Sequence, residues 1–252
     1  MQKIILKDGT ALITGASGGR GKAMATSLGE SGVRVALVAR DVHALNETVA
    51  ELVALGCRAK AFPADVSDEE QVEKLERDVR DWAGPVSILI NNVGANLRKR
   101  VEDFTLKEWN DIVRTNLTTI FLMCRAFIPG MKAYGAGRII NMASTMAHIS
   151  LPPRTVYSAT KSAVLGFTRS LALELAQDSI SVVSISPGPF ETEMNAPMLQ
   201  DPALYASFTS RIPLGRWGQV KEIGALARFL CSDEATFITG TDILIDGGWC
   251  SQ

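Results

Sequence analysis

Short apolar runs, each the length of a buried strand, alternate along the chain with longer runs whose apolar residues recur at helical spacing. The strand candidates are 11–14, 33–39, 59–62, 87–90, 138–142, 181–186 and 243–245. The main helix candidates are 22–30, 42–55, 69–82, 107–132, 155–177 and 220–230. Such alternation is typical of right-handed βαβ units. We therefore predict an α/β fold with a doubly wound parallel sheet of about seven strands, helices on both faces and a single domain over residues 1–252.

Composition argues against several classes of function. The 252 residues include 26 basic and 27 acidic side chains, a formal charge of −1, so the chain has no general attraction for nucleic acid or an anionic membrane. No apolar run reaches the length of about 18 residues that a membrane span needs, and no signal-peptide pattern is present, so we expect a cytoplasmic protein. With two histidines and four widely spaced cysteines, we expect neither a metal site nor a disulfide framework.

A glycine-rich loop joins the first strand candidate to the helix candidate 22–30. The sequence from Thr14 to Gly21 has the spacing TGxxxGxG. Glycines at such a turn let the backbone approach a pyrophosphate group, which rests on the positive N-terminal end of the helix. The sequence therefore predicts a dinucleotide site. The loop residues expected to contact the dinucleotide are Gly15, Ser17, Gly18, Gly19, Arg20 and Gly21.

Tyr157 and Lys161 carry the strongest indication of chemistry. They are four residues apart in the helix candidate 155–177, so both side chains project from one helix face. A cation about 5 Å from the phenol, at an effective dielectric constant of ~20, stabilises the phenolate by about 3 kcal/mol. Deprotonation near neutral pH needs roughly 4 kcal/mol, so a second positive charge, such as an oxidised nicotinamide ring, would complement Lys161. We predict that Tyr157 is the general acid and base.

Ser144 completes this catalytic set. It follows the strand candidate 138–142, and ligands of open α/β sheets bind at the carboxyl ends of the strands. Its hydroxyl is therefore expected to hydrogen-bond a substrate carbonyl. In the alternative interpretation, Tyr157 and Lys161 lie on a surface helix without a catalytic role, and Ser144 is an ordinary turn residue. The glycine loop favours the catalytic interpretation.

Together, the glycine loop, Ser144, Tyr157 and Lys161 resemble the classical short-chain dehydrogenase/reductase family, over residues 8–248. The resemblance implies a Rossmann fold. Asn116 matches the family's helix asparagine, which holds a proton-relay water beside the lysine. Segments 64–66, 91–94 and 187–192 resemble the family's adenine-contacting, NNAG and PGxxxT motifs. The residues that the resemblance adds to the cofactor site are Asp65, Val66, Asn92, Val93, Gly94, Pro187, Gly188, Phe190 and Thr192, with Tyr157 and Lys161 themselves.

Three positions depart from the family pattern. Val93 replaces an alanine, and Ala143 stands where many relatives have a first serine. Arg20 lies between the last two loop glycines, where the family usually has Ile or Leu packed beneath the cofactor. Two interpretations of Arg20 stay open: a cation near the phosphates, or a side chain that reaches solvent.

The end of the second strand candidate bears on the choice of cofactor. NAD-dependent enzymes have an acidic residue there for the ribose hydroxyls, whereas a basic residue suits the extra phosphate of NADP. This chain has Ala39 followed by Arg40, whose guanidinium can bind phosphate in a bidentate contact. Asp41 could pair with Arg40, repel the phosphate, or act only as a helix N-cap. We predict NADP(H) rather than NAD(H).

Three segments are candidates for contact with substrate. The resemblance implies a lid at about 189–213, whose apolar residues either line the substrate or pack the lid against the body. These residues are Phe190, Met194, Met198 and Leu199. The basic segment 98–100 either attracts a carboxylate or phosphate or is simply solvated. The candidates between Ser144 and Tyr157 are Met146, His148 and Arg154.

In overall pattern the chain is similar to gluconate 5-dehydrogenases, tropinone reductase-like proteins and 3-oxoacyl-thioester reductases. The resemblance predicts an NADPH-dependent carbonyl reductase, reversibly an alcohol dehydrogenase, acting on a small molecule. The alternatives are an NAD-dependent sugar-acid or polyol dehydrogenase and a catalytically silent nucleotide sensor or scaffold. The family also implies self-association through the helices that carry Asn116 and Tyr157 and through the strand near 243–249, and hence a homotetramer with 222 symmetry, or a dimer.

Overall fold

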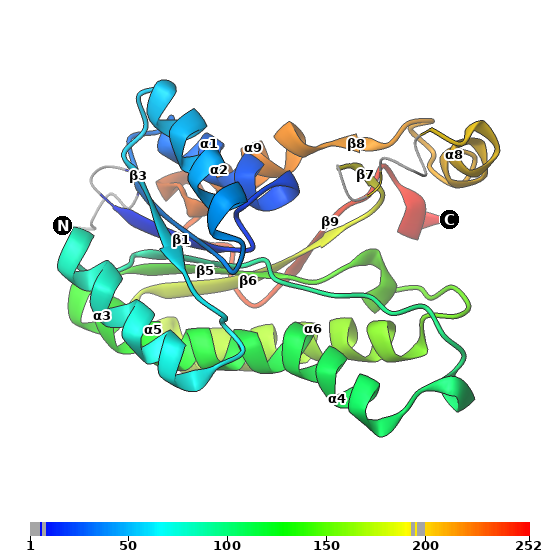
Figure 1. Cartoon of the computed structure of the whole chain (residues 1–252), viewed down its shortest axis with the longest axis horizontal. Helices are drawn as coiled ribbons and strands as arrows, with labels where there is room; N and C mark the ends of the chain where they lie inside the picture. Colours follow the sequence, from blue (N-terminus) through cyan, green and yellow to red (C-terminus); the bar gives the residue numbers. More distant parts are fainter. Residues whose placement is uncertain (1–5, 7–8, 193–194, 196–199) are drawn as a thin grey trace.

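A seven-stranded parallel sheet forms the centre of the computed structural model, which describes residues 6, 9–192, 195 and 200–252 (Figure 1). The order of the strands is β3-β2-β1-β4-β5-β6-β9. Their bounds are β1 (Thr10–Thr14), β2 (Arg34–Ala39), β3 (Ala59–Pro63), β4 (Ile88–Asn91), β5 (Gly137–Met142), β6 (Ile180–Pro187) and β9 (Asp242–Ile245). This arrangement confirms the predicted doubly wound α/β fold.

Helices cover both faces of the sheet (Figure 1). One face carries α1 (Gly19–Gly29), α2 (Val42–Ala54) and α9 (Val220–Cys231). The other face carries α3 (Glu69–Ala83), α5 (Thr119–Tyr134) and α6 (Thr155–Leu175), with α4 (Leu106–Val113) leading into α5. Each face has its own apolar cluster, and β1 contributes to both, since Ala11 and Ile13 pack on one face and Leu12 on the other. This two-sided burial explains why the strands are almost continuously apolar.

The strand order reverses between β1 and β4. From β1 the chain winds outward through β2 and β3, then returns to the other side of β1 and continues through β4, β5 and β6. The residue pair Ile13 and Ile90 is in register, so β1 and β4 end at the same edge of the sheet. The helices that follow these two strands lie on opposite faces, and in open α/β sheets such a reversal opens the crevice in which ligands bind.

The predicted helix 107–132 is present, but a π-helical segment, Arg114–Thr118, lies within it between α4 and α5. A π turn contains an extra residue, and such turns occur frequently at functional sites. Here it contains Asn116, whose side chain is completely buried. Apolar periodicity could not predict this turn, because Asn116 makes its hydrogen bonds to parts of the chain that are distant in sequence.

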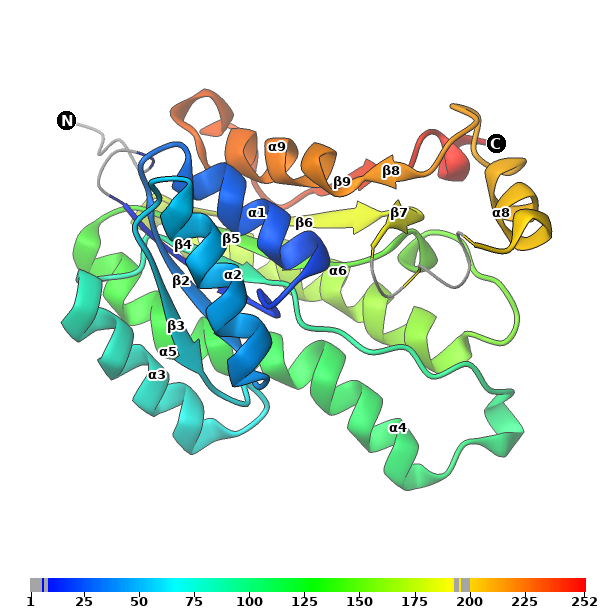
Figure 2. The ribbon, with the colours of Figure 1, turned by 45° about the horizontal axis from the view of Figure 1, so that its top comes forward.

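A small layer lies beyond the carboxyl edge of the sheet, at the same end of the molecule as the C-terminus (Figure 2). It contains β7 (Phe190–Glu191), which pairs in parallel with β8 (Gly218–Gln219), and α8 (Pro202–Thr209). Phe190 is buried against the backbone of Gly218, where a Cβ atom would lie 2.7 Å from the ring. Phe190 therefore packs its segment against the body, while Met194, Met198 and Leu199 lie outside the described residues.

Aromatic rings hold α8 in place. Tyr205 stacks on Trp217 with 6.0 Å between ring centroids. Phe208 contacts Trp217 at 5.7 Å and the edge of Trp249 at 6.0 Å. Such pairs contribute about 0.5–1.5 kcal/mol each beyond the burial of their area. The helical part of the predicted lid thus rests on the C-terminal segment of the chain.

Candidate active site

A cavity of about 670 Å³ opens at the switch point, beyond the carboxyl ends of β1, β2 and β4. The predicted cofactor residues that line it are Gly15, Ser17, Gly18, Gly19, Arg20, Gly21, Arg40, Asp65, Val66, Asn92, Val93, Gly94 and Thr192. The five others do not line it: Tyr157, Lys161, Pro187, Gly188 and Phe190. Gly188 instead packs against Asp246, since a Cβ atom on it would lie 2.9 Å from the Asp246 Cα. Most of the predicted set is therefore brought together.

The glycine loop adopts a conformation that side chains would not allow. Gly15 and Gly19 have φ angles of +62° and +50°, in the left-handed region. Gly21 has an ordinary φ angle, but a Cβ atom there would lie 2.2 Å from the Gly15 carbonyl oxygen and 2.9 Å from Asn92 Nδ2. The first turn of α1 is therefore pressed directly against the end of β1, which brings the positive end of the helix to the cavity.

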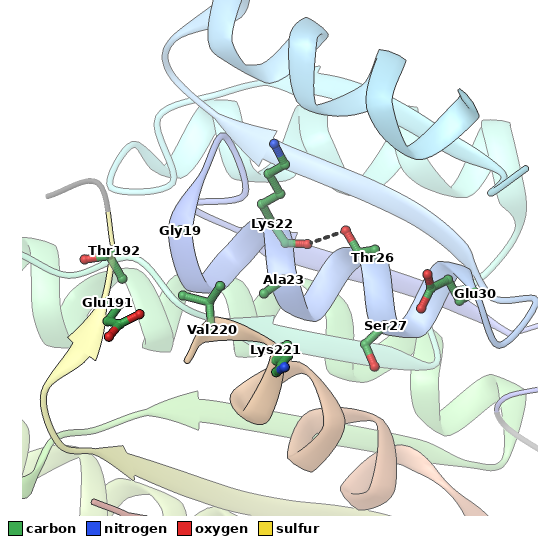
Figure 3. Close-up of a pocket in the computed structure, with 10 residues that line it drawn as sticks. All are labelled: Gly19, Lys22, Ala23, Thr26, Ser27, Glu30, Glu191, Thr192, Val220 and Lys221. Atoms are coloured by element: carbon green, nitrogen blue, oxygen red, sulfur yellow. Dashed lines mark hydrogen bonds between the residues drawn. The ribbon is translucent and has the colours of Figure 1, made fainter. Parts of the chain in front are cut away.

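A groove between α1 and α9 adjoins this cavity (Figure 3). Gly19 and Thr192 line both spaces. A Cβ atom on Gly19 would lie 3.8 Å from Thr192 Cγ2, so Thr192 stands beside the glycine loop although it follows β7. Lys22 lines the groove, but its ammonium points toward α2, where it is paired with Glu51 at 2.5 Å (Figure 3).

Asn92 ties the ends of β1 and β4 together. Its backbone N–H donates to Thr14 Oγ1 at 2.9 Å, and its Nδ2 donates to the carbonyls of Thr14 and Gly15 at 3.0 and 3.1 Å. The remaining polar atom, Asn92 Oδ1, is buried and has no hydrogen-bond partner within the described ranges. A buried acceptor of this kind costs free energy unless a donor reaches it.

Arg40 stands at the end of β2, with its side chain 80% exposed and 4.0 Å from a carboxylate oxygen of Asp65. Asp41 does not pair with it in the structure. Instead, the Asp41 carboxylate accepts from the backbone N–H of Ala44 at 3.0 Å and caps α2. Burial raises the pKa of Asp65, but hydrogen bonds from Ser67 and the charges of Arg40 and Arg114 outweigh it and hold the pKa below its ordinary value.

Asn116 fixes the backbone that follows β4. Its Oδ1 accepts from the Ala95 N–H at 2.7 Å, while its Nδ2 donates to the Ala95 carbonyl at 2.9 Å and to Thr160 Oγ1 at 3.0 Å. Gly94 lies between this amide and Lys161, because a Cβ atom on Gly94 would be 3.5 Å from Asn116 Oδ1 and 3.4 Å from Lys161 Nζ. Asn116, Gly94 and Lys161 thus form one packed unit at the wall of the cavity.

The predicted catalytic residues lie close together. Lys161 Nζ is buried and donates to the Met142 carbonyl, at the end of β5, over 2.6 Å. It lies 5.9 Å from the centroid of the Tyr157 ring. Ser144 follows the same strand, and its Oγ accepts from the Met146 N–H at 3.2 Å. Burial first, and then the charge of Arg20, lower the pKa of Lys161 to about 7, so Lys161 is a weaker cation than the sequence suggested.

Two unpaired arginines flank Tyr157. Arg20 is half-buried, and Arg154, the residue before α6, is half-buried beside Arg98. Burial lowers the pKa of Arg154, Arg98 lowers it further, and Tyr157 acts in the opposite direction. None of the three guanidinium groups makes a hydrogen bond or ion pair with another described residue. The surroundings of Tyr157 are therefore strongly positive.

Sequence reasoning missed two residues and could not rank a third. Thr14 holds the Asn92 backbone, and Thr160 holds Asn116. Their signals were present, since Thr14 opens the TGxxxGxG loop and Thr160 precedes Lys161. The three candidates for substrate contact between Ser144 and Tyr157 differ in the structure. Met146 is buried, and His148 is paired with Asp242 at 2.7 Å. Arg154 lies within electrostatic range of Tyr157, and its guanidinium has no partner among the described residues.

The four cysteines are free thiols. In the described part of the chain, no group of three or more His, Cys, Asp or Glu side chains is arranged to hold a metal ion. No described helix is long and apolar enough to cross a membrane.

Comparison with known proteins agrees with this geometry. A family model described as enoyl-(acyl carrier protein) reductase matches residues 15–250. Gluconate 5-dehydrogenase of Gluconobacter oxydans (strain 621H) is 34% identical over 247 residues, covering 96% of this chain and 95% of that protein. The chain belongs to the short-chain dehydrogenase/reductase family. It is an oxidoreductase.

Two further members show how broad the similarity is. The 3-oxoacyl-(acyl-carrier-protein) reductase FabG of Vibrio harveyi is 38% identical over 244 residues, covering 94% of this chain and 96% of that protein. The solved structure of a gluconate 5-dehydrogenase from Burkholderia cenocepacia J2315, in complex with NADP and tartrate, matches with a TM-score of 0.92. It is 32% identical and covers 98% of this chain and 96% of that one. Family membership thus leaves the substrate to be inferred from the site.

Proposed function

We propose that this chain is an NADP(H)-dependent oxidoreductase that interconverts a ketone and a secondary alcohol, with Tyr157 as general acid and base. The observation that carries the proposal is the grouping of Tyr157, Lys161 and Ser144 beside a glycine-lined cavity at the switch point of the sheet. A nucleotide sensor or scaffold would need the cavity but not this group of side chains. The catalytic interpretation is therefore favoured.

The cavity suits a phosphorylated dinucleotide. Gly21 lets the first turn of α1 pack closely against the end of β1, and Arg40 provides an exposed guanidinium at the end of β2. The Burkholderia cenocepacia relative is a complex with NADP. A bound cofactor of this kind supplies the exchange of a hydride with the substrate carbon, which no side chain can perform.

Three side chains act on the substrate oxygen. Tyr157 donates a proton to it during reduction and accepts one during oxidation. The Ser144 Oγ accepts a hydrogen bond from the Met146 N–H, so its own hydrogen remains free to donate to the same oxygen. The Lys161 ammonium uses one of its three donors on Met142 and has two left for a ribose hydroxyl and a water.

Asn116 contributes by fixing the wall next to Lys161. Both of its amide hydrogens are used, on Ala95 and Thr160. A relay water near Lys161 is therefore held through acceptor oxygens of Asn116, not through its amino group. This refines the predicted role of Asn116.

The substrate class follows from Arg98 and Arg154. The charge of Arg98 lowers the pKa of Arg154, and neither guanidinium has an acidic partner among the described residues, so an anion between them would relieve their repulsion. A guanidinium can bind a carboxylate in a bidentate contact. This favours an oxo or hydroxy acid over a neutral ketone, in line with the sugar-acid alternative, and relatives named gluconate 5-dehydrogenase agree with it.

The proposal is tested by following NADPH oxidation at 340 nm across matched pairs of ketones, each pair consisting of an acid and its amide. We expect turnover, with kcat/KM at least about tenfold higher for the acids. Arg154→Gln should remove that preference, whereas Arg77→Gln, at an exposed site on α3, should retain it. Binding of NADPH without turnover of any ketone would support the sensor instead. Equal rates for acids and amides would reject only the anionic substrate.

Arg40→Ala should raise the KM for NADPH by more than about tenfold and leave the KM for NADH almost unchanged, because only NADPH has a 2′-phosphate to lose. The expectation rests on Arg40 being the cation at the end of β2, 4.0 Å from Asp65. Steady-state kinetics with both cofactors measure it. Equal effects on the two cofactors, or a wild type that prefers NADH, would contradict it.

We also expect a homotetramer with 222 symmetry, or a dimer. Phe121 on α5 is 46% exposed and Leu173 on α6 is 81% exposed, while Leu244 on β9 is 39% exposed. Apolar side chains on these elements are buried if each packs on its symmetry mate. Light scattering at micromolar protein measures the mass. A fully active species of 27.1 kDa would rule out this assembly.

A further inference from the structure

Arg20 is the one residue of the glycine loop that brings a charge into the cavity. It sits between Gly19 and Gly21, in the first turn of α1, and is among the residues that line the cavity, with Gly94 and Thr192. It is half-buried and forms no hydrogen bond or ion pair with another described residue. Of the two interpretations left open by the sequence, the solvent-directed one is therefore disfavoured.

The charge of Arg20 faces the catalytic side chains. It contributes to the lowered pKa of Lys161, after burial, and the phenol of Tyr157 in turn raises the pKa of Arg20 against the effect of its own burial. Both effects require that the guanidinium lies within electrostatic range of these groups. No acidic side chain is among the causes acting on Arg20 or Lys161. Within the described ranges, no acidic side chain therefore compensates the positive charge in this part of the cavity.

The same charge must also face the nicotinamide ring, if the proposed function holds. The proton and the hydride add to the two adjacent atoms of one carbonyl group, so the ring and the phenol of Tyr157 approach the substrate within a few ångströms of each other. A cation that acts on Tyr157 therefore acts on the ring as well. The oxidised ring is positively charged and the reduced ring is neutral, so Arg20 repels only the oxidised form.

We propose that Arg20 discriminates between the two redox states of the cofactor, weakening the binding of NADP⁺ relative to NADPH. The inference rests on the proposed function. It assigns a role to position 20, at which this chain departs from its family. An Ile or Leu there would place no charge beside the nicotinamide ring. An enzyme of this kind retains the reduced cofactor and releases the oxidised one, which suits it to work as a reductase.

The experiment is a pair of binding titrations on the full-length protein. The Kd of NADPH is measured by its fluorescence, and that of NADP⁺ by displacement of NADPH. We expect the ratio of the two constants, NADP⁺ over NADPH, to fall about tenfold in Arg20→Met, whose side chain is long and neutral. Arg20→Lys, which keeps the charge, should retain the wild-type ratio. A contact of Arg20 with the phosphates would change both dissociation constants by the same factor, because both redox states carry the same phosphates. Its effect therefore cancels in the ratio.

Three outcomes are distinguishable. A lower ratio in Arg20→Met, with the ratio preserved in Arg20→Lys, supports the proposal. An unchanged ratio in Arg20→Met, or an equal fall in both variants, overturns it, because the charge would then not be what discriminates. Failure of the wild type to bind either cofactor overturns the proposed function itself, and this is recognised before any variant is compared.

Discussion

Tyr157→Phe is expected to lower kcat by roughly 100- to 10 000-fold while leaving the Kd of NADPH nearly unchanged, because general acid–base catalysis contributes about that factor. The substitution deletes only the phenolic oxygen and keeps the ring that lies 5.9 Å from Lys161 Nζ. The hydrogen bond from Lys161 to Met142 does not involve the phenol, so the lysine stays in place. The measurement pairs kcat, from NADPH oxidation, with a fluorescence titration of NADPH.

Tyr134→Phe is the matched control, since it makes the same chemical change at the last residue of α5, outside the residues that line the cavity. It should retain wild-type turnover. If Tyr157→Phe kept an activity within tenfold of the wild type, Tyr157 would not be the proton donor. A parallel loss of NADPH binding would assign the residue to cofactor binding instead.

Much of the fold could be predicted because the sheet is buried on both faces. The residues of a strand such as β5 are then all buried and include an apolar run, so its predicted range, 138–142, differs from Gly137–Met142 by one residue. The small β7 and β8 pair could not be predicted this way. Two-residue strands have no periodicity, and their pairing depends on Phe190 packing over Gly218.

In the site, too, local sequence patterns predict some features, whereas others depend on contacts that only the folded chain makes. The glycine loop and the spacing of Tyr157 and Lys161 are local patterns with a direct geometric meaning. The orientation of Arg20 is not local, because a long side chain can point to solvent or into the cavity from the same backbone. The role of Asp41 likewise depended on whether its carboxylate reached Ala44 or Arg40, and it caps α2.

Gly21→Ala should abolish cofactor binding, with the Kd of NADPH raised by at least about 100-fold. The new Cβ atom would lie 2.2 Å from the Gly15 carbonyl oxygen and 2.9 Å from Asn92 Nδ2, both fixed in the core of the site. Either the loop or α1 has to move, and both form the cavity. Overpacking of this kind costs about 1–3 kcal/mol, so a lower melting temperature is expected as well.

Gly130→Ala separates this effect from the general consequences of adding a methyl group. Gly130 lies within α5, and a Cβ atom there would meet nothing within 4 Å. Since alanine favours helices by about 1 kcal/mol over glycine, this control should bind NADPH normally and melt no lower than the wild type. Fluorescence titration and thermal unfolding of both variants provide the comparison. Wild-type NADPH affinity in Gly21→Ala would mean that the loop yields without cost, and that close contact of α1 with the end of β1 is not what shapes the cofactor site.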